Sequence, residues 1–273
     1  MISFMEFSPW FHIFVAYLIY ILIAVLTSVL VGRIAGDLKD FRVRNSPRVL
    51  LIGAIANLIA MGAILLLLVF WDRQPLSAIG LQLHLKDIFV ALVGFVGTFI
   101  LAIEFLFTLG RMKRISSVEI RKPATSAEVS QMSLGLVALI PVILQEEVLN
   151  RAYVSLNLLP LGPAGIILAS TVIFVLIHFL TNRGNLPQVI SWVVSGLVLI
   201  TSYLMSGSIW VPVLLHYATD TANVLVFNIT GQFSLFQTTP AITEGQRAAF
   251  RVVYGVVILV ILLAVYRLHF QLG

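Results

Sequence analysis

Two adjacent glutamates, Glu146 and Glu147, lie in a segment (residues 136–151) that is otherwise almost wholly apolar. A carboxylate at the centre of a bilayer costs several kcal/mol, so such residues are usually kept for function and face the interior of a helix bundle. Other ionisable residues lie at similar depth in later hydrophobic segments. They are His178, His216 and Asp220.

Helical spacing predicts different roles for the two glutamates. Glu147 and Arg151 are four residues apart, so on a helix they share a face and can form an ion pair. Glu146 points about 100° away from Glu147 and is left without that partner. Burial disfavours the charged form of such a carboxylate, so Glu146 can serve as a general base near neutral pH.

His216 and Asp220 are also four residues apart and share a helix face, and Asn223 lies on nearly the same face. Asp220 can simply neutralise and orient His216, and a lone His178 can simply donate to a backbone carbonyl. In the functional interpretation, these side chains point into the same cavity as Glu146. At about 1.5 Å per residue, His178 lies nearer the cytosol than the others, so we expect a cavity that opens to the cytoplasmic side.

Composition indicates an integral membrane protein. The 273-residue chain is 60% hydrophobic and 11% charged, and several apolar segments reach the length of about 20 residues that crosses a bilayer. The absence of cysteine excludes disulfides, thiolate metal sites and a cysteine nucleophile. The excess of basic residues belongs to loops, so we interpret it as membrane topology and not as nucleic-acid binding.

We predict an all-α, polytopic membrane helix bundle of about eight transmembrane helices, forming one integral domain over residues 1–273. The motif-bearing core covers about residues 126–228, with peripheral spans in 10–109 and 250–268. The eight predicted spans are 10–31, 49–70, 88–109, 132–157, 163–181, 187–204, 209–228 and 250–268.

The distribution of basic residues predicts the orientation. With both termini external, the cytoplasmic loops hold thirteen basic residues, and only Arg73, Lys86 and Arg267 lie outside. The thirteen are Arg33, Lys39, Arg42, Arg44, Arg48, Arg111, Lys113, Arg114, Arg121, Lys122, Arg183, Arg247 and Arg251.

Local signals refine the fourth span. Thr125 and Glu128 have the spacing of a helix capping box, so we expect the helix to begin there. Pro141 removes one backbone donor inside the helix and predicts a kink about one turn before the glutamates. Residues 110–131 and 231–245 are predicted to be loops.

Several intramembrane hydrolases are excluded by their motifs. The chain has no His-Glu-x-x-His zinc motif and no Gly-x-Ser-Gly element, and Asp220 is the only aspartate in the predicted spans that could form a diaspartyl site. A glutamate with two histidines remains. Because membrane carboxylates and histidines also form proton relays, an ion-coupled transporter is an alternative, but we find no internal repeat to support it.

Three motifs in order resemble those of the CAAX protease and bacteriocin-processing family of intramembrane glutamate endopeptidases (type II CAAX prenyl endopeptidase-like). Residues 146–151 resemble its Glu-Glu-x-x-x-Arg motif, and residues 174–178 resemble Phe-x-x-x-His. Residues 206–220 resemble its later motif, in which a histidine is followed four residues on by Asn or Asp. Leu76–Leu81, before the third span, is also similar to these proteins.

The resemblance implies an intramembrane endopeptidase. Glu146 would activate the attacking water beside His178, His216 and Asp220 would stabilise the oxyanion, and Glu147 and Arg151 would support the site. From its spacing after His216, and not from the resemblance, Asn223 is a further supporting candidate. Prenyl-protein members carry Asn in place of Asp220, and an ionised aspartate would repel an oxyanion. Asp220 must therefore be protonated, orient His216 from behind, or help to hold a metal.

We expect no cofactor and a metal-independent reaction, with zinc bound by Glu146, His178, His216 and Asp220 as the alternative. The expected partners are the lipid bilayer and a peptide or protein substrate, lipid-modified or membrane-embedded, and no nucleic acid. A non-proteolytic scaffold, immunity or regulatory protein of the same fold is the competing hypothesis.

Overall fold

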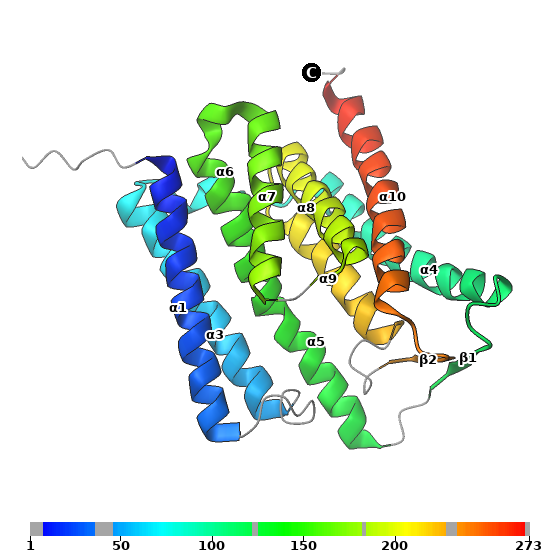
Figure 1. The fold of residues 1–273 in the computed structure, drawn as a ribbon. Coiled ribbons are helices and arrows are strands. Elements are labelled where there is room, and N and C mark those ends of the chain that lie inside the picture. The colour runs from blue at the N-terminus through cyan, green and yellow to red at the C-terminus, as the bar shows by residue number, and fades with distance from the viewer. Residues whose placement is uncertain (1–7, 36–45, 122–124, 182–183, 228–233, 271–273) are drawn as a thin grey trace, which may run out of the picture.

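The computed structural model is a bundle of helices and describes residues 8–35, 46–121, 125–181, 184–227 and 234–270 (Figure 1). The all-α, polytopic class predicted from the sequence is confirmed. Short π-helical segments follow α3 (Leu67–Trp71) and α5 (Val148–Tyr153), and 3-10 turns cover Leu76–Ile79 and Leu159–Leu161. The helices are α1 (Pro9–Ala35), α3 (Pro47–Leu66), α4 (Leu85–Arg111), α5 (Ser126–Glu147), α6 (Val154–Asn157), α7 (Gly162–Thr181), α8 (Leu186–Ser206), α9 (Trp210–Leu225) and α10 (Glu244–Phe270).

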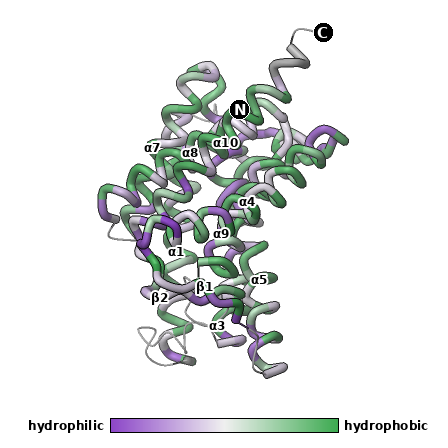
Figure 2. The backbone as a smooth tube through the Cα atoms, turned by 90° about the vertical axis from the view of Figure 1, so that its right-hand side faces the viewer, coloured by the Kyte–Doolittle hydropathy of each residue, from purple (hydrophilic) through white to green (hydrophobic). Residues whose placement is uncertain are grey.

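Within the described residues, seven helices are long and apolar enough to cross a membrane, so the protein is an integral, multi-pass membrane protein. Figure 2 shows that these helices are largely hydrophobic along their length. The start of α1 and the end of α10 lie at the same end of the molecule.

The predicted span at residues 209–228 differs from the other seven. It forms α9, whose 16 residues extend only about 24 Å at about 1.5 Å per residue, less than the hydrocarbon thickness of about 30 Å. This helix packs against α4, α8 and α5. Because neighbouring helices cover α9, it can carry the polar His216 and Asp220 at moderate cost.

Two hydrophobic clusters hold the bundle together. One joins α1, α3 and the end of α5 to α8 and α9, with the buried Ile64, Leu149 and Ile200 among its members. The other joins α4 and α10 to α8 and α9, with Leu106, Leu215 and Phe250. Helices α8 and α9 belong to both clusters, so they fix the position of each half of the bundle relative to the other.

The two predicted loops contain a small sheet that was not anticipated. β1 (Ser117–Ile120) pairs antiparallel with β2 (Phe236–Thr239), and Ser117 lies opposite Thr239. Residues 122–124 and 231–233 of these loops lie outside the described part. The sheet ties the segment before α5 to the segment before α10 (Figure 1).

Helix α5 begins as predicted, since the Thr125 side chain accepts a hydrogen bond from the Glu128 backbone N–H at 3.2 Å. It continues through Pro141 to Glu147. The change from α to π geometry comes directly after the glutamates, at Val148. The kink expected at Pro141 stays a prediction.

The Leu76–Leu81 segment docks onto the turn between α8 and α9. The Ile209 N–H donates to the Gly80 carbonyl at 2.9 Å, and the Trp210 indole N–H donates to the Leu81 carbonyl at 3.0 Å. Gly80 has a φ of +75°, and a Cβ there would lie 2.3 Å from the Gly207 carbonyl oxygen. Only glycine fits this position without displacing backbone.

Gly80→Ala is therefore expected to lower the thermal unfolding temperature in detergent. The left-handed backbone alone costs about 1 kcal/mol for a residue with a Cβ, and the backbone clash adds to it. Gly207→Ala is the matched control, because its φ is +66° but a Cβ there would have no other atom within 4 Å. Equal losses for the two variants would contradict the docking contact.

Candidate active site

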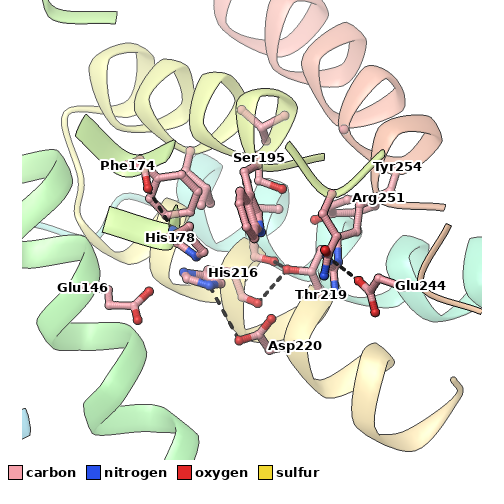
Figure 3. Close-up of a pocket in the computed structure, with 16 residues that line it drawn as sticks. Glu146, Phe174, His178, Ser195, His216, Thr219, Asp220, Glu244, Arg251 and Tyr254 are labelled. Carbon is pink, nitrogen blue, oxygen red and sulfur yellow. Dashed lines mark hydrogen bonds and ion pairs between the residues drawn. The ribbon is translucent and has the colours of Figure 1, made fainter. Parts of the chain in front are cut away.

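A cavity of about 400 Å³ lies among α5, α7, α8, α9 and α10 (Figure 3). The four residues predicted to be catalytic, Glu146, His178, His216 and Asp220, all line it. They come from α5, α7 and α9. The other lining residues are Phe174, Gln188, Trp192, Ser195, Val198, Leu199, Leu215, Thr219, Glu244, Arg251, Tyr254 and Gly255.

The predicted ion pair between Glu147 and Arg151 is present, and neither residue lines this cavity. Arg151 Nε lies 2.9 Å from Glu147 Oε2, and both side chains are fully buried. The guanidinium also lies 4.6 Å from the centre of the Phe174 ring, and its Nη1 is 3.5 Å from Ser170 Oγ. Arg151 therefore joins the Glu-Glu-x-x-x-Arg segment to the start of the Phe-x-x-x-His segment.

Glu147 also binds a second partner that the sequence did not reveal. The Nδ1–H of His216 donates to its other oxygen, Oε1, at 2.8 Å. This contact fixes the rotation of the imidazole and leaves Nε2 as the nitrogen on the opposite edge of the ring. Glu147 is thus the residue that orients His216 from behind.

Asp220 lies on the other side of the same imidazole. Its Oδ2 is 3.6 Å from His216 Nε2, and 40% of its side chain is exposed. The expectation that Asp220 could orient His216 from behind does not fit, because Glu147 already occupies that position. At 3.6 Å the contact is too long for a hydrogen bond. Because Nδ1 already donates to Glu147, Nε2 can donate to another group only when the ring carries both protons as an imidazolium.

His178 fits both interpretations of the sequence, because it bonds to a backbone carbonyl and also lines the cavity. Its Nδ1 donates to the Phe174 carbonyl at 2.9 Å, one helical turn earlier, and the ring still lines the cavity. The rings of Phe174 and Trp192 hold it, with centroids at 4.2 Å and 5.3 Å. Because a carbonyl only accepts, Nδ1 carries the proton and Nε2 can act as an acceptor.

Glu146 carries the carboxylate that lacks a close partner. Among the described residues its side chain forms no hydrogen bond and no ion pair, although it lies near enough to His216 and Asp220 to interact electrostatically. Figure 3 shows its carboxylate pointing toward the two imidazole rings. This agrees with the division of roles predicted from helical spacing.

A π-helical turn, Val148–Tyr153, follows the two glutamates. The Asn150 side-chain amide donates to the Glu146 carbonyl at 2.8 Å, and Ser170 Oγ donates to the Asn150 carbonyl at 2.8 Å. Single π-helical turns inside α-helices are frequent at functional sites. Here the turn carries both Asn150 and the buried Arg151, which pairs with Glu147.

Asn223 lies apart from this group. It is buried on α9, it does not line the cavity, and its Oδ1 has no hydrogen-bond partner in the described structure. Seven residues after His216, it is two helical turns further along the helix. The structure therefore places it near the same face but outside the cavity.

Helix α10, predicted as a peripheral span, contributes residues that the sequence analysis missed. Arg251 and Glu244 line the cavity, and Arg251 Nη1 lies 3.4 Å from Ser191 Oγ and 3.7 Å from Glu244 Oε1. Arg247 binds Glu244 through Nε and Nη2. The spacing of Glu244, Arg247 and Arg251 along one helix face was the available signal.

Among the described residues, the structure shows no set of side chains arranged as ligands for the alternative zinc site. Within the parts of the chain that the structure describes, no three His, Cys, Asp or Glu side chains are arranged to hold a metal ion. The predicted metal independence of the reaction stays a prediction, because it concerns activity.

The fold and the cavity define a polytopic helical membrane protein in which a half-buried glutamate and two histidines line one site. Residues 128–222, which contain all three motifs, match the family Type II CAAX prenyl endopeptidase Rce1-like. A domain of this family is therefore present over those residues, which confirms the resemblance predicted from the motifs. At the level of the family, this supports an intramembrane protease of the CAAX type. Comparisons with curated proteins and with solved structures gave no significant match.

The buried ion pair generates a stability prediction. Glu147→Leu leaves Arg151 charged and uncompensated, which typically costs about 3–5 kcal/mol. We expect a large fall in thermal stability in detergent, partly restored in the double variant with Arg151→Met. Glu146→Leu is the matched control on the neighbouring residue, and its effect is expected to be small. A larger loss for the control would contradict the assignment of Glu147 as the structural carboxylate.

Proposed function

We propose that this protein is a glutamate-dependent intramembrane endopeptidase that cuts peptides near the cytoplasmic leaflet. The observation that carries the proposal is the convergence of Glu146, His178 and His216 on one cavity, from α5, α7 and α9. A scaffold protein has no need to bring an uncompensated carboxylate and two imidazoles together inside a membrane, where each is expensive.

In the proposed reaction, Glu146 accepts a proton from a water molecule while the water oxygen attacks the carbonyl carbon of the peptide bond. His178 stands beside Glu146 and its Nε2 can accept a hydrogen bond from the same water. When the C–N bond breaks, Glu146 returns the proton to the leaving amine. Proton transfer of this kind typically contributes a factor of about 10²–10⁴ to the rate.

His216 is the proposed donor to the developing oxyanion. Its Nδ1–H donates to Glu147, so Nε2 faces the cavity in a fixed direction, as an oxyanion donor requires. In this role the ring is the doubly protonated imidazolium, because only that form also carries a proton on Nε2. Asp220 lies beside this nitrogen and can add a second donor only when its carboxyl group carries a proton. An arginine of α10, Arg251, interacts electrostatically with Asp220 and supplies a positive charge in the same cavity.

The position of the cavity supports cleavage on the cytoplasmic side. Gln188 and Glu244, in the first turns of α8 and α10, line it, and both turns adjoin loops predicted to be cytoplasmic. We infer the orientation from the excess of basic residues in those loops. Lys39, Arg42, Arg44, Lys122 and Arg183, which contribute to that excess, lie outside the described residues.

The proposed substrate is a peptide or protein that reaches the site from the membrane. The family's description names prenyl endopeptidases, so a lipid-modified C-terminal peptide is one candidate and the end of another membrane protein is a second. No metal ion takes part in the proposed reaction.

The decisive experiment is quantitative mapping of protein termini in membranes from cells that express the wild type or Glu146→Gln. We expect new termini with the wild type that disappear with Glu146→Gln, because the amide cannot accept the proton of water. Glu104→Gln is the matched control, since Glu104 is an exposed α4 glutamate that pairs with Arg111. Identical termini in all three membranes, with the phenotype unchanged by Glu146→Gln, would favour the scaffold function.

Asp220→Asn tests the second donor. Asn donates a hydrogen bond but never ionises, so activity on an identified substrate should stay within about tenfold of the wild type, the value of one hydrogen bond. Asp220→Ala should lose more. Cleavage rates for the purified variants check this, and equally large losses with Asn and with Ala would show that the ionised carboxylate itself is required.

A further inference from the structure

A second, smaller cavity of about 130 Å³ adjoins the first at Glu146. The side chains of Glu146, Phe174 and His178 line both cavities. The large cavity extends toward α8, α9 and α10, and the small one extends toward α1. Its other lining residues are Tyr17, Tyr20, Gln145, Leu149, Asn150 and Ile177.

The lining of the small cavity is polar and contains a side chain that the protein itself does not satisfy. Gln145 is fully buried, and neither its amide nitrogen nor its amide oxygen has a hydrogen-bond partner among the described residues. Leaving a buried amide unpaired typically costs about 1–3 kcal/mol per group. The unpaired amide groups of Gln145 are therefore expected to form hydrogen bonds with a molecule that enters the cavity.

The neighbouring polar groups fit water. Tyr17 donates to Asn150 Oδ1, and Asn150 in turn donates to the Glu146 carbonyl, so these two groups are held in place. Tyr20 and Gln145 add a hydroxyl and an amide to the same small space. One water molecule takes about 30 Å³ in the liquid and needs two to four polar partners, so the cavity has room and partners for several.

We propose that this small cavity is the water site of the protein, from which Glu146 draws the attacking water while a peptide occupies the large cavity. Gln145 and Tyr20 are positioning residues that hold water on the α1 side of Glu146. The inference rests on the proposed peptidase function, and it separates the path of the water from the path of the peptide.

The first test measures water access without any activity assay. The chain contains no cysteine, so Gln145→Cys introduces a single thiol whose reaction with methyl methanethiosulfonate can be followed by mass spectrometry. We expect modification of the intact protein in detergent. Ala152→Cys is the control, because Ala152 is fully buried in the same segment and lines neither cavity. An unreactive thiol at 145, or equal rates at the two positions, would overturn the proposal.

The second test uses cleavage of an identified peptide. Gln145→Met keeps the length of the side chain but removes its polar atoms, and Tyr20→Phe removes one hydroxyl. Each should lower kcat about tenfold, the value of one hydrogen bond, with KM nearly unchanged because the peptide cavity is intact. Ile143→Leu, an apolar exchange at a buried α5 residue that lines neither cavity, should leave both constants near their wild-type values.

The outcomes separate the two proposals. A rise in KM with kcat unchanged would show that the small cavity binds part of the peptide, and it would overturn the water-site assignment. If the wild type cleaves no peptide at all, the proposed peptidase function fails, while the thiol measurement still decides whether water enters beside Glu146.

Discussion

The site depends on one buried carboxylate, Glu147, which binds two bases at once. Arg151 compensates its charge within the same segment, and His216 brings α9 into register with α5. A buried ion pair adds little net stability over an apolar core, but removing one partner is expensive. The pair therefore acts mainly as a constraint that allows only the arrangement in which His216 faces the cavity.

This constraint explains why the two adjacent glutamates have different partners and surroundings. Glu147 points toward the core between α5, α7 and α9, where both of its oxygens have a basic partner. Glu146, one residue earlier and about 100° around the helix, points into the space between two cavities. The π-helical turn that follows keeps Asn150 bonded to the Glu146 backbone while the Arg151 guanidinium reaches Phe174. Sequence adjacency thus produces one carboxylate with two basic partners and one that lines the cavities without a close partner.

The sequence predicted the features that depend on local residue spacing and on the free-energy cost of placing a charged side chain in a membrane. Glu147 with Arg151, the start of α5 at Thr125 and the convergence of Glu146, His178, His216 and Asp220 follow from such rules. The bond between Glu147 and His216 was not predictable, because it joins residues far apart in the chain. The same holds for the contribution of Arg251 and for the β1–β2 pair, whose segments are short and polar. The length of α9 was overestimated, since hydropathy does not distinguish a helix in lipid from one covered by protein.

The shortness of α9 has a consequence for how the chain enters the membrane. A segment of this length that contains a histidine and an aspartate has, by itself, only a weak tendency to pass from the translocon into the bilayer. One central aspartate opposes insertion by about 2.5–3.5 kcal/mol. Helix α8, joined to it through the tight turn at Gly207, is longer and more apolar. Partitioning of the two as a hairpin would let the hydrophobicity of α8 carry the polar helix into the bilayer. His216 and Asp220 would then reach Glu147 and Glu146 only after the α8–α9 hairpin has entered the bilayer.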